Sequence, residues 1–222
     1  MKNFSVERAH NAQLCLSKKI ILKDRLPHQI ETVGGVDVSY SGNIGVGASA
    51  VLDYESLKLL ESQVAACRVK MPYVPTLLSF REIAPAMAAI KKLKIQPDVL
   101  LVDAQGLAHP YRCGFASHLG LIMGKPTIGA AKSRLIGEPK EINGQTFLVD
   151  RGEVIGAVVT TKQGGKPVYV SIGHMVSLET AVKIVKHCTK NRIPEPTLKA
   201  HNFAIKERIR LAKESKVNIA ER

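Results

Sequence analysis

The sequence lacks the cysteine spacings and the apolar segments that mark several large classes of protein. Its four cysteines, at positions 15, 67, 113 and 188, are widely separated, so neither a CxxC metal site nor a disulfide framework is indicated. This pattern favours a reduced protein of the cytoplasm. The first residues, Met1–Phe4, show no apolar stretch of a secretory signal. No apolar run is as long as a membrane span, so we expect no membrane partner.

Glycine-rich phosphate loops, internal repeats and flexible linkers are also missing. Without a Walker-type loop, hydrolysis of nucleoside triphosphates has little support. Without repeats or a Ser/Gly-rich linker, the 222 residues are expected to form one domain that spans 1–222. A chain of this length buries a sizeable core without disulfides or metals as staples.

What the sequence does have is an excess of positive charge. It contains 32 Lys and Arg against 19 Asp and Glu, which gives a net charge of +13 and a pI near 9.7. Such an excess suggests a polyanionic partner, either nucleic acid or an anionic membrane surface, with an inert basic surface as the alternative. Residues 183–222 alone hold eleven Lys or Arg and four Glu. A helix there suits contact with phosphates, or else it is a solvated face with i,i+4 ion pairs.

The hydrophobic pattern predicts an α/β fold with a mixed sheet flanked by helices. Strands at 32–40, 44–52 and 57–69, joined by turns at 41–43 and 53–56, predict an antiparallel three-strand meander. The remaining chain alternates between helices and strands, which adds parallel strands to that sheet. The helices are expected at 5–21, 85–94, 114–123, 177–190 and from 197 to about 214, and the further strands at 98–103, 126–131, 147–161 and 167–172.

Two aspartates occupy strand positions where a carboxylate needs a partner. Asp37 lies inside the first strand, and the two-residue period places it on the opposite face from Val36 and Val38. Leaving a buried carboxylate unpaired costs on the order of several kcal/mol. Asp103 ends the strand 98–103, at the carboxyl end where α/β sheets place their sites. The alternatives are an Asp37 that accepts local hydrogen bonds and an Asp103 that forms an Asx-turn.

Glu82 is the third acidic candidate. Its spacing from Ser79 fits a capping box, and Pro85 suits a first turn, so we expect Glu82 at or just before a helix start. Together with Asp37 and Asp103 it would form a hard oxygen site, which suits Mg²⁺ or Mn²⁺. Such an ion lowers the pKa of its bound water and neutralises charge on a scissile phosphate.

Basic side chains stand near the same predicted strand ends. Lys132 follows the strand 126–131, where it would stabilise charge on a phosphate, although an exposed surface lysine is the commoner case. His109, on the loop after Asp103, either orients a phosphate or water or is a turn residue. His201 shares a helix face with apolar neighbours, so a core position is its default interpretation. The same default applies to His118 and His174.

The segment Pro72-Tyr73-Val74-Pro75 is unusual because two prolines stiffen an extended tip. An aromatic and a branched side chain on a rigid tip suit a wedge that inserts between bases and supports extrusion of one nucleotide. The alternative is a loop that packs Tyr73 onto the core.

Several tracts occur in an order that carries a resemblance. They are Gly35-Val36-Asp37-Val38-Ser39, Pro72–Pro75 through Phe80-Arg81-Glu82, Val102–Gly106 with Ala108-His109-Pro110, Ser117–Gly120, Ile128–Ser133, and Pro194–Thr197 with Ala200-His201. In this order they resemble the endonuclease V family, the deoxyinosine-directed repair nucleases with an RNase H-like fold. The match runs from roughly residue 30 to residue 205, and the order of the tracts makes it specific.

The resemblance implies a role for each candidate residue. Asp37 and Asp103 would bind the catalytic Mg²⁺ or Mn²⁺ with Glu82 completing the acidic cluster, and His201 would belong to the active site rather than the core. Lys132 and His109 would contact the scissile or a neighbouring phosphate. The wedge would be Tyr73 with Pro75, and the candidate base-pocket positions are Leu78, Gly106, Gly129 and Leu135. The implied partner is DNA with deaminated bases, bound by a monomer and cut at the second phosphodiester on the 3′ side to leave 3′-hydroxyl and 5′-phosphate ends.

The chain departs from the family pattern at two places. Thr76 follows the wedge and Ala104 follows Asp103, whereas the family usually has glycine at both positions. Glycine permits close backbone approach and a positive φ, so we expect altered or broadened base selectivity or a shifted wedge backbone. The rival functions are a ribonuclease that cuts inosine-containing RNA, a non-catalytic binder of modified nucleic acid, and a basic protein that coats RNA.

Overall fold

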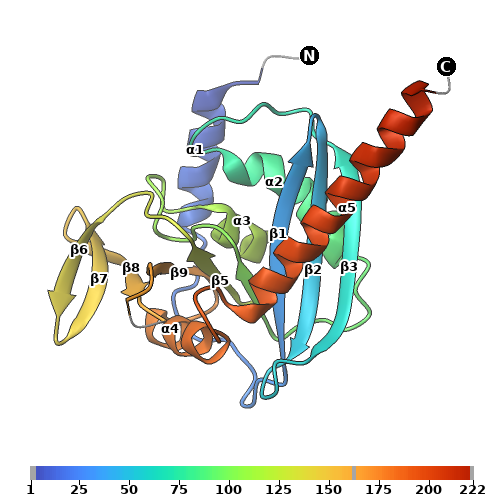
Figure 1. Ribbon diagram of the computed structural model, residues 1–222. Helices are drawn as coiled ribbons and strands as arrows, with labels where there is room; N and C mark the ends of the chain where they lie inside the picture. Colours follow the sequence, from blue (N-terminus) through green and yellow to red (C-terminus); the bar gives the residue numbers. More distant parts are fainter. Residues whose placement is uncertain (1–3, 162–163, 221–222) are drawn as a thin grey trace.

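A computed structural model describes residues 4–161 and 164–220, and its strands form one sheet with helices on both faces (Figure 1). The nine strands lie in the order β3-β2-β1-β4-β5-β9-β8-β7-β6. Their bounds are β1 (Thr32–Ser41), β2 (Ile44–Asp53), β3 (Leu59–Arg68), β4 (Val99–Val102), β5 (Thr127–Ala131), β6 (Glu138–Ile142), β7 (Gln145–Asp150), β8 (Glu153–Val159) and β9 (Val168–His174). The helices are α1 (Val6–Ser17), α2 (Leu78–Ile90), α3 (Phe115–Met123), α4 (Leu178–His187) and α5 (Glu195–Ala220).

The predicted meander and the mixed sheet are both confirmed. Strands β1, β2 and β3 pair antiparallel, whereas β1, β4 and β5 pair parallel. The remaining strands extend the sheet antiparallel from β9 to β6. All four residues of β4 are fully buried, because helices cover the sheet on both sides of this central strand.

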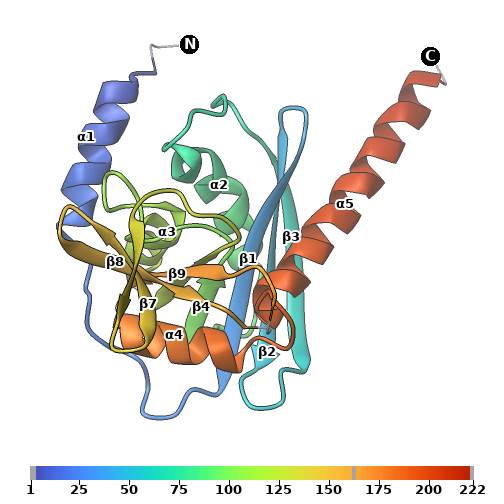
Figure 2. The same cartoon turned by 60° about the vertical axis from the view of Figure 1, so that its left-hand side comes forward.

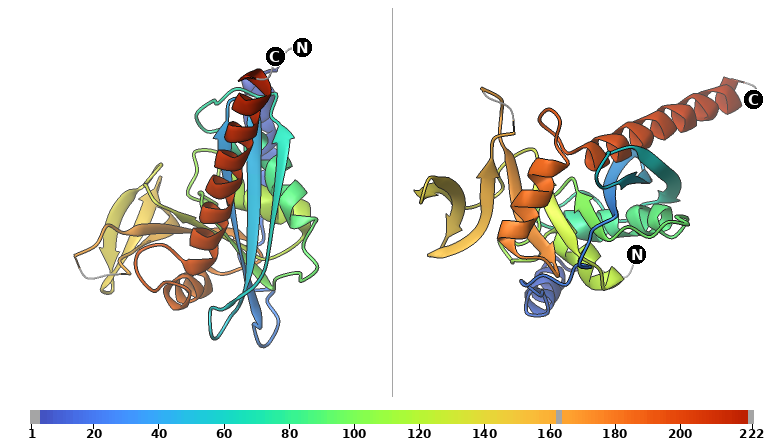
Figure 3. Two further views of the ribbon diagram at one scale, coloured as in Figure 1. Left: turned by 45° about the vertical axis from the view of Figure 1, so that its right-hand side comes forward. Right: turned by 90° about the horizontal axis from the view of Figure 1, so that it is seen from below.

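Two cores lie on the two faces of the sheet. Along β4, Val99 and Leu101 pack into the core beneath α4 and α5, while Leu100 and Val102 pack into the core beneath α2 and α3. Figure 3 shows the sheet between α5 on one side and α2 on the other, and Figure 2 shows α1 at the margin of the molecule. The central strand β4 therefore has helices above both of its faces.

Glycines let two helices approach the strands directly. A Cβ built on Gly35 of β1 would lie 1.9 Å from the carbonyl oxygen of Pro196 in α5. On the other face, a Cβ on Gly47 of β2 would lie 2.0 Å from the carbonyl oxygen of Pro85 in α2. No side chain fits at either position, so both helices are seated on the backbone of the strands.

Two predictions for helix α2 are wrong. The helix begins at Leu78 rather than near Pro85, and Pro85 lies buried inside it. Ser79 is not the N-cap, because Leu77 holds that position and the Ser79 hydroxyl instead shares a 3.1 Å hydrogen bond with Nδ1 of His118. Tertiary packing on both sides of Pro85 has overridden the usual proline preference.

Strand β6 and the split between β7 and β8 were missed by the sequence analysis. Every residue of β6 is exposed, so it has no apolar alternation that would indicate a strand. The segment expected as one strand over 147–161 turns at Arg151 and Gly152, both with positive φ, the conformation of tight hairpin turns.

Helix α5 is longer than predicted and its C-terminal half projects past the sheet (Figure 3). Among residues 4–161 and 164–220, every helix is too short or too polar to cross a membrane.

We expect Gly35→Ala to lower the free energy of unfolding by about 1–3 kcal/mol, because its methyl group forces α5 away from β1. Urea denaturation measures this change. Ala66→Ser, which adds one atom at an exposed position of β3, should stay within about 0.5 kcal/mol of the wild type. Equal stability of Gly35→Ala and wild type would contradict the close approach of α5.

Candidate functional site

The sheet register brings Asp37 and Asp103 together. Strands β1 and β4 run parallel with Val36 opposite Val102, so the two aspartates take the next place on neighbouring strands. The amide of Asp103 also donates to the carbonyl oxygen of Val36 at 3.2 Å. Because alternate residues share a face, both carboxylates lie on the side of the sheet that carries α5.

Helix α5 adds His201 to this pair. Nδ1 of His201 lies 2.7 Å from Oδ2 of Asp37, and one turn further along the helix the hydroxyl of Ser39 donates to the carbonyl oxygen of Ala204 at 2.9 Å. The side chain of His201 is 37% exposed, so the core position expected for it by default is wrong. His118 and His174 are buried, as that default predicts.

The donor set suits a divalent cation. Asp37, Asp103 and His201 each offer one ligand atom, and these atoms lie within 4.8 Å of one another. Burial, and then the neighbouring charge of Asp103, raise the pKa of Asp37, while the contact with His201 opposes this shift. Two carboxylates with one imidazole fit Mg²⁺ or Mn²⁺, which prefer oxygen ligands.

Glu82 lies beside this group rather than within it. It projects from the second turn of α2, is buried, and accepts a long hydrogen bond of 3.5 Å from the hydroxyl of Tyr40. Burial, followed by the charges of Asp37 and Asp103, raises the pKa of Glu82 to about 8. Glu82 is therefore close enough to interact electrostatically with both aspartates. A cation near them would favour the anionic form of Glu82.

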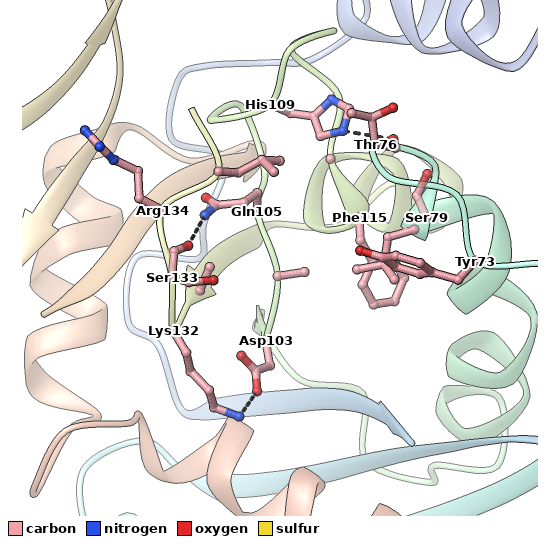
Figure 4. A pocket seen from close by; sticks show the side chains of 15 residues that line it. Tyr73, Thr76, Ser79, Asp103, Gln105, His109, Phe115, Lys132, Ser133 and Arg134 are labelled. Atoms are coloured by element: carbon pink, nitrogen blue, oxygen red, sulfur yellow. Dashed lines mark hydrogen bonds and ion pairs between the residues drawn. The ribbon is translucent and has the colours of Figure 1, made fainter. Parts of the chain in front are cut away.

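Lys132 supplies a positive charge next to the aspartates. It directly follows β5, and its Nζ forms an ion pair with Oδ2 of Asp103 (Figure 4). Its side chain is 38% exposed, so the ammonium group faces solvent as well as Asp103. An anionic group that approaches Asp103 from solvent meets Lys132 there.

A cavity of about 360 Å³ opens beside Asp103 and Lys132 (Figure 4). Four of the predicted substrate-binding residues line it, namely Tyr73, Leu78, His109 and Leu135. Thr76 and Ala104, the two positions from which altered base selectivity is expected, also line it. Further lining residues, which the sequence did not indicate as pocket positions, are Ser79, Gln105, Gly114, Phe115, Ala131, Ser133 and Arg134. Many are ordinary apolar or small residues whose place becomes visible only in the fold.

Three predicted substrate-binding positions, Pro75, Gly106 and Gly129, do not line this cavity. A Cβ on Gly106 would lie 2.1 Å from the carbonyl oxygen of Ile172, and one on Gly129 would lie 2.6 Å from both the Ala104 oxygen and the Gly106 nitrogen. The two glycines let the segment after Asp103 pack directly on β5 and β9. The absence of side chains at Gly106 and Gly129 thus determines how closely the segment that lines the cavity lies to the sheet.

His109 has no ring nitrogen free for a phosphate. Its Nε2 donates to the carbonyl oxygen of Thr76 at 3.0 Å, and its Nδ1 accepts from the amide of Tyr111 at 3.2 Å. Burial lowers the pKa of His109 to about 4, so the ring is neutral at pH 7. His109 thus forms part of the cavity wall, and the phosphate contact expected for it stays a prediction.

The wedge segment ends in a tight turn centred on Pro75 and Thr76. The amide of Leu77 donates to the carbonyl oxygen of Val74 at 3.0 Å, and Thr76 has a φ of +70°. Proline followed by a residue of positive φ is the pattern of a type II turn, whose third position favours glycine. A left-handed β-branched residue costs about 1–2 kcal/mol. Tyr73, just before this turn, is 67% exposed, as a wedge requires.

Enzymes that hydrolyse phosphodiesters with divalent cations use carboxylates held next to a phosphate-binding site. The fold and the site together define an α/β protein with a candidate divalent-cation site of the kind that nucleases use. The family model for endonuclease V matches residues 15–202. The chain belongs to the endonuclease V family.

Individual relatives agree over nearly the whole chain. An endonuclease V of Thermofilum pendens is 47% identical over 206 residues, which cover 91% of this chain and 89% of the relative. The crystal structure of endonuclease V from Streptomyces avermitilis superposes with a TM-score of 0.86 at 35% identity, covering 96% of both chains. The structure from Ciona intestinalis, in complex with a DNA 24-mer that contains an inosine followed by a ribo-adenosine, gives 0.83 at 34% identity, covering 93% of this chain and 98% of that one. The RNase H-like fold expected from the resemblance is confirmed.

We expect Mn²⁺ to raise the melting temperature of the wild type and to lose this effect in Asp37→Asn and Asp103→Asn. A cation that binds only the folded chain stabilises it by about 2.7 kcal/mol at 100 times its Kd. Thermal denaturation with and without Mn²⁺ measures the shift. Glu141→Gln, at an exposed position of β6, should respond like the wild type. If the two aspartate variants gain as much as the wild type, the cation binds elsewhere.

Proposed function

We propose that the protein is a Mg²⁺-dependent endonuclease, with Mn²⁺ as a possible substitute, that nicks DNA at the second phosphodiester bond 3′ to deoxyinosine and so initiates repair. The observation that carries this proposal is the adjacency of Asp37 to Asp103, which itself lines a cavity large enough for a base. The relative from Ciona intestinalis, crystallised with inosine-containing DNA, supports the substrate class. We further propose a single-domain monomer acting in the cytoplasm.

The residues of the site divide the chemistry between them. Asp37 and Asp103 would hold the cation, with Glu82 as a third acidic group next to them. When bound, the cation supplies an activated water and neutralises charge on the phosphate. His201 orients the Asp37 carboxylate through its 2.7 Å contact. Lys132 would move from Asp103 toward the charge that develops on the phosphate.

The cavity would receive the extruded base. Tyr73 stands exposed at its rim, where its ring would replace the base in the stack. Phe115 and Leu78 give the cavity apolar walls, and Ala104 and Ser133 also line it. The resemblance to endonuclease V implies that backbone groups of this pocket read the base.

The positive charge of the chain suits a protein that binds the phosphates of a DNA duplex. The net charge is +13, and phosphate contacts of this kind weaken as salt rises. In the described part of α5, Arg210 is paired with Glu207 and Glu214. This residue therefore fits the solvated-face interpretation of the helix.

A hypoxanthine-bearing duplex with Mg²⁺ tests the activity. We expect Asp37→Asn and Asp103→Asn to slow nicking by at least about a hundredfold, because each removes a charged ligand of the cation. Single-turnover rates on labelled duplex measure the loss. Glu141→Gln should cut at the wild-type rate. Wild-type speed in both aspartate variants would refute the assigned site.

The base preference follows from Thr76 and Ala104. Both line the cavity and both carry a Cβ where the family usually has none, so we expect a profile altered from, or broader than, hypoxanthine alone. Nicking of matched duplexes with hypoxanthine, xanthine, uracil or an abasic site measures this profile. A profile dominated by hypoxanthine, unchanged in Thr76→Gly, would contradict the expectation.

Inosine-containing RNA is a second candidate substrate, favoured by the ribo-adenosine that follows inosine in the complex of the Ciona relative. Matched DNA, RNA and single-ribonucleotide strands distinguish the two, because an enzyme that uses a 2′-hydroxyl cuts faster when one is present. Binding without strand scission after addition of Mg²⁺ would instead identify a non-catalytic binder.

A further inference from the structure

Helix α1 places a buried glutamine behind Thr76, one of the residues that line the base cavity. The buried residues of α1 are Ala9 and Gln13, and Gln13 has no exposed surface. The helix lies at the margin of the molecule, next to α3 and outside the sheet (Figure 2). The most buried side chain of this helix is therefore polar, which packing alone does not explain.

Gln13 uses its amide group to connect two loops around the cavity. Its Nε2 donates to the carbonyl oxygen of Thr76 at 2.9 Å and to that of Cys113 at 3.0 Å. Its Oε1 is buried and has no hydrogen-bond partner among the described residues. An orphaned buried acceptor is unfavourable, so the benefit of Gln13 must lie in the two bonds that it donates.

Thr76 is the point where these bonds converge. Its carbonyl oxygen accepts from both Gln13 and Nε2 of His109. Its hydroxyl shares a 2.9 Å hydrogen bond with Nε2 of His10, one turn before Gln13 on α1. His10 is itself fixed, because its ring stacks on Tyr111 and its Nδ1 shares a hydrogen bond with the Tyr111 hydroxyl. Both the main chain and the side chain of Thr76 are thus held from α1.

These contacts act on the one residue of the wedge turn whose backbone is strained. Thr76 has a φ of +70° at a turn position that favours glycine. A threonine there would leave the left-handed conformation if nothing held its carbonyl oxygen. Rotation at Thr76 would move Tyr73 and the cavity wall together, because both adjoin this turn.

We propose that Gln13, assisted by His10, is a positioning residue for recognition of the damaged base: it holds Thr76 in the left-handed turn and so sets the wedge and the cavity before DNA binds. This inference rests on the proposed nuclease function. Gln13 does not touch the substrate. Its hydrogen bonds allow Thr76 to keep a positive φ at a turn position that otherwise favours glycine.

The test is a double-mutant cycle between Gln13→Leu and Thr76→Gly. In the Thr76 background, Gln13→Leu should raise the KM for a hypoxanthine duplex by about tenfold, since coupled positions interact on this scale. The single-turnover rate at saturating duplex should fall less than about threefold, because the cation site is untouched. In the Thr76→Gly background the KM effect of Gln13→Leu should shrink to under about threefold, because glycine adopts the turn unaided.

The controls separate positioning from general stability. Leu14→Ala, on the exposed face of α1, should keep the wild-type KM. His10→Phe keeps the stacking on Tyr111 but loses the bond to Thr76, so it should raise KM in the same direction as Gln13→Leu. Affinity for undamaged duplex should be unchanged in all variants. Equal KM effects of Gln13→Leu in both backgrounds would overturn the proposal.

A measurement without substrate keeps the inference independent of the nuclease assay. Hydrogen exchange of the peptide 72–80, which contains the Leu77 amide of the turn, should speed up in Gln13→Leu and not in Leu14→Ala. Unchanged exchange in Gln13→Leu would refute the positioning role. If exchange is faster in Gln13→Leu but the wild-type protein does not nick hypoxanthine DNA, the proposed function is refuted and the structural role of Gln13 stands.

Discussion

The repulsion between two carboxylates fixed side by side governs this structure. The register of β1 against β4 places Asp37 next to Asp103, and neither can move away without breaking the central pairing of the sheet. Lys132 pairs with Asp103 and His201 with Asp37, yet burial, and after it the charge of Asp103, still raises the pKa of Asp37. A site in this condition binds a divalent cation readily, because the cation supplies the missing charge.

The rest of the fold serves to bring other groups to that fixed pair. Gly35 allows α5 to rest on β1, and this close approach is what delivers His201 to Asp37. Gly47 does the same for α2 on the other face, and the helix brings Glu82 near both aspartates. Because both helices rest directly on strand backbone, the positions of His201 and Glu82 relative to the two aspartates follow from the packing of the fold.

The sequence predicts what depends on local patterns. The meander, the buried strand β4 and the strand positions of Asp37 and Asp103 follow from alternation and from the cost of an unpaired buried carboxylate. The start of α2, the exposed strand β6 and the bond between His201 and Asp37 depend on contacts between distant segments. Helical spacing alone placed His201 in the core, whereas the resemblance to a family placed it in the active site.

Thr76 shows how a chain tolerates a residue that its local conformation disfavours. A Pro-Gly turn needs no outside support, because glycine adopts a positive φ freely. A Pro-Thr turn needs tertiary contacts, and here three side chains from α1 and from the loop before α3 provide them. The left-handed conformation of Thr76 is thus stabilised by hydrogen bonds from Gln13, His10 and His109. Substitutions on α1, outside the acidic cluster, then alter the base cavity, because Gln13 and His10 hold the carbonyl oxygen and the hydroxyl of Thr76.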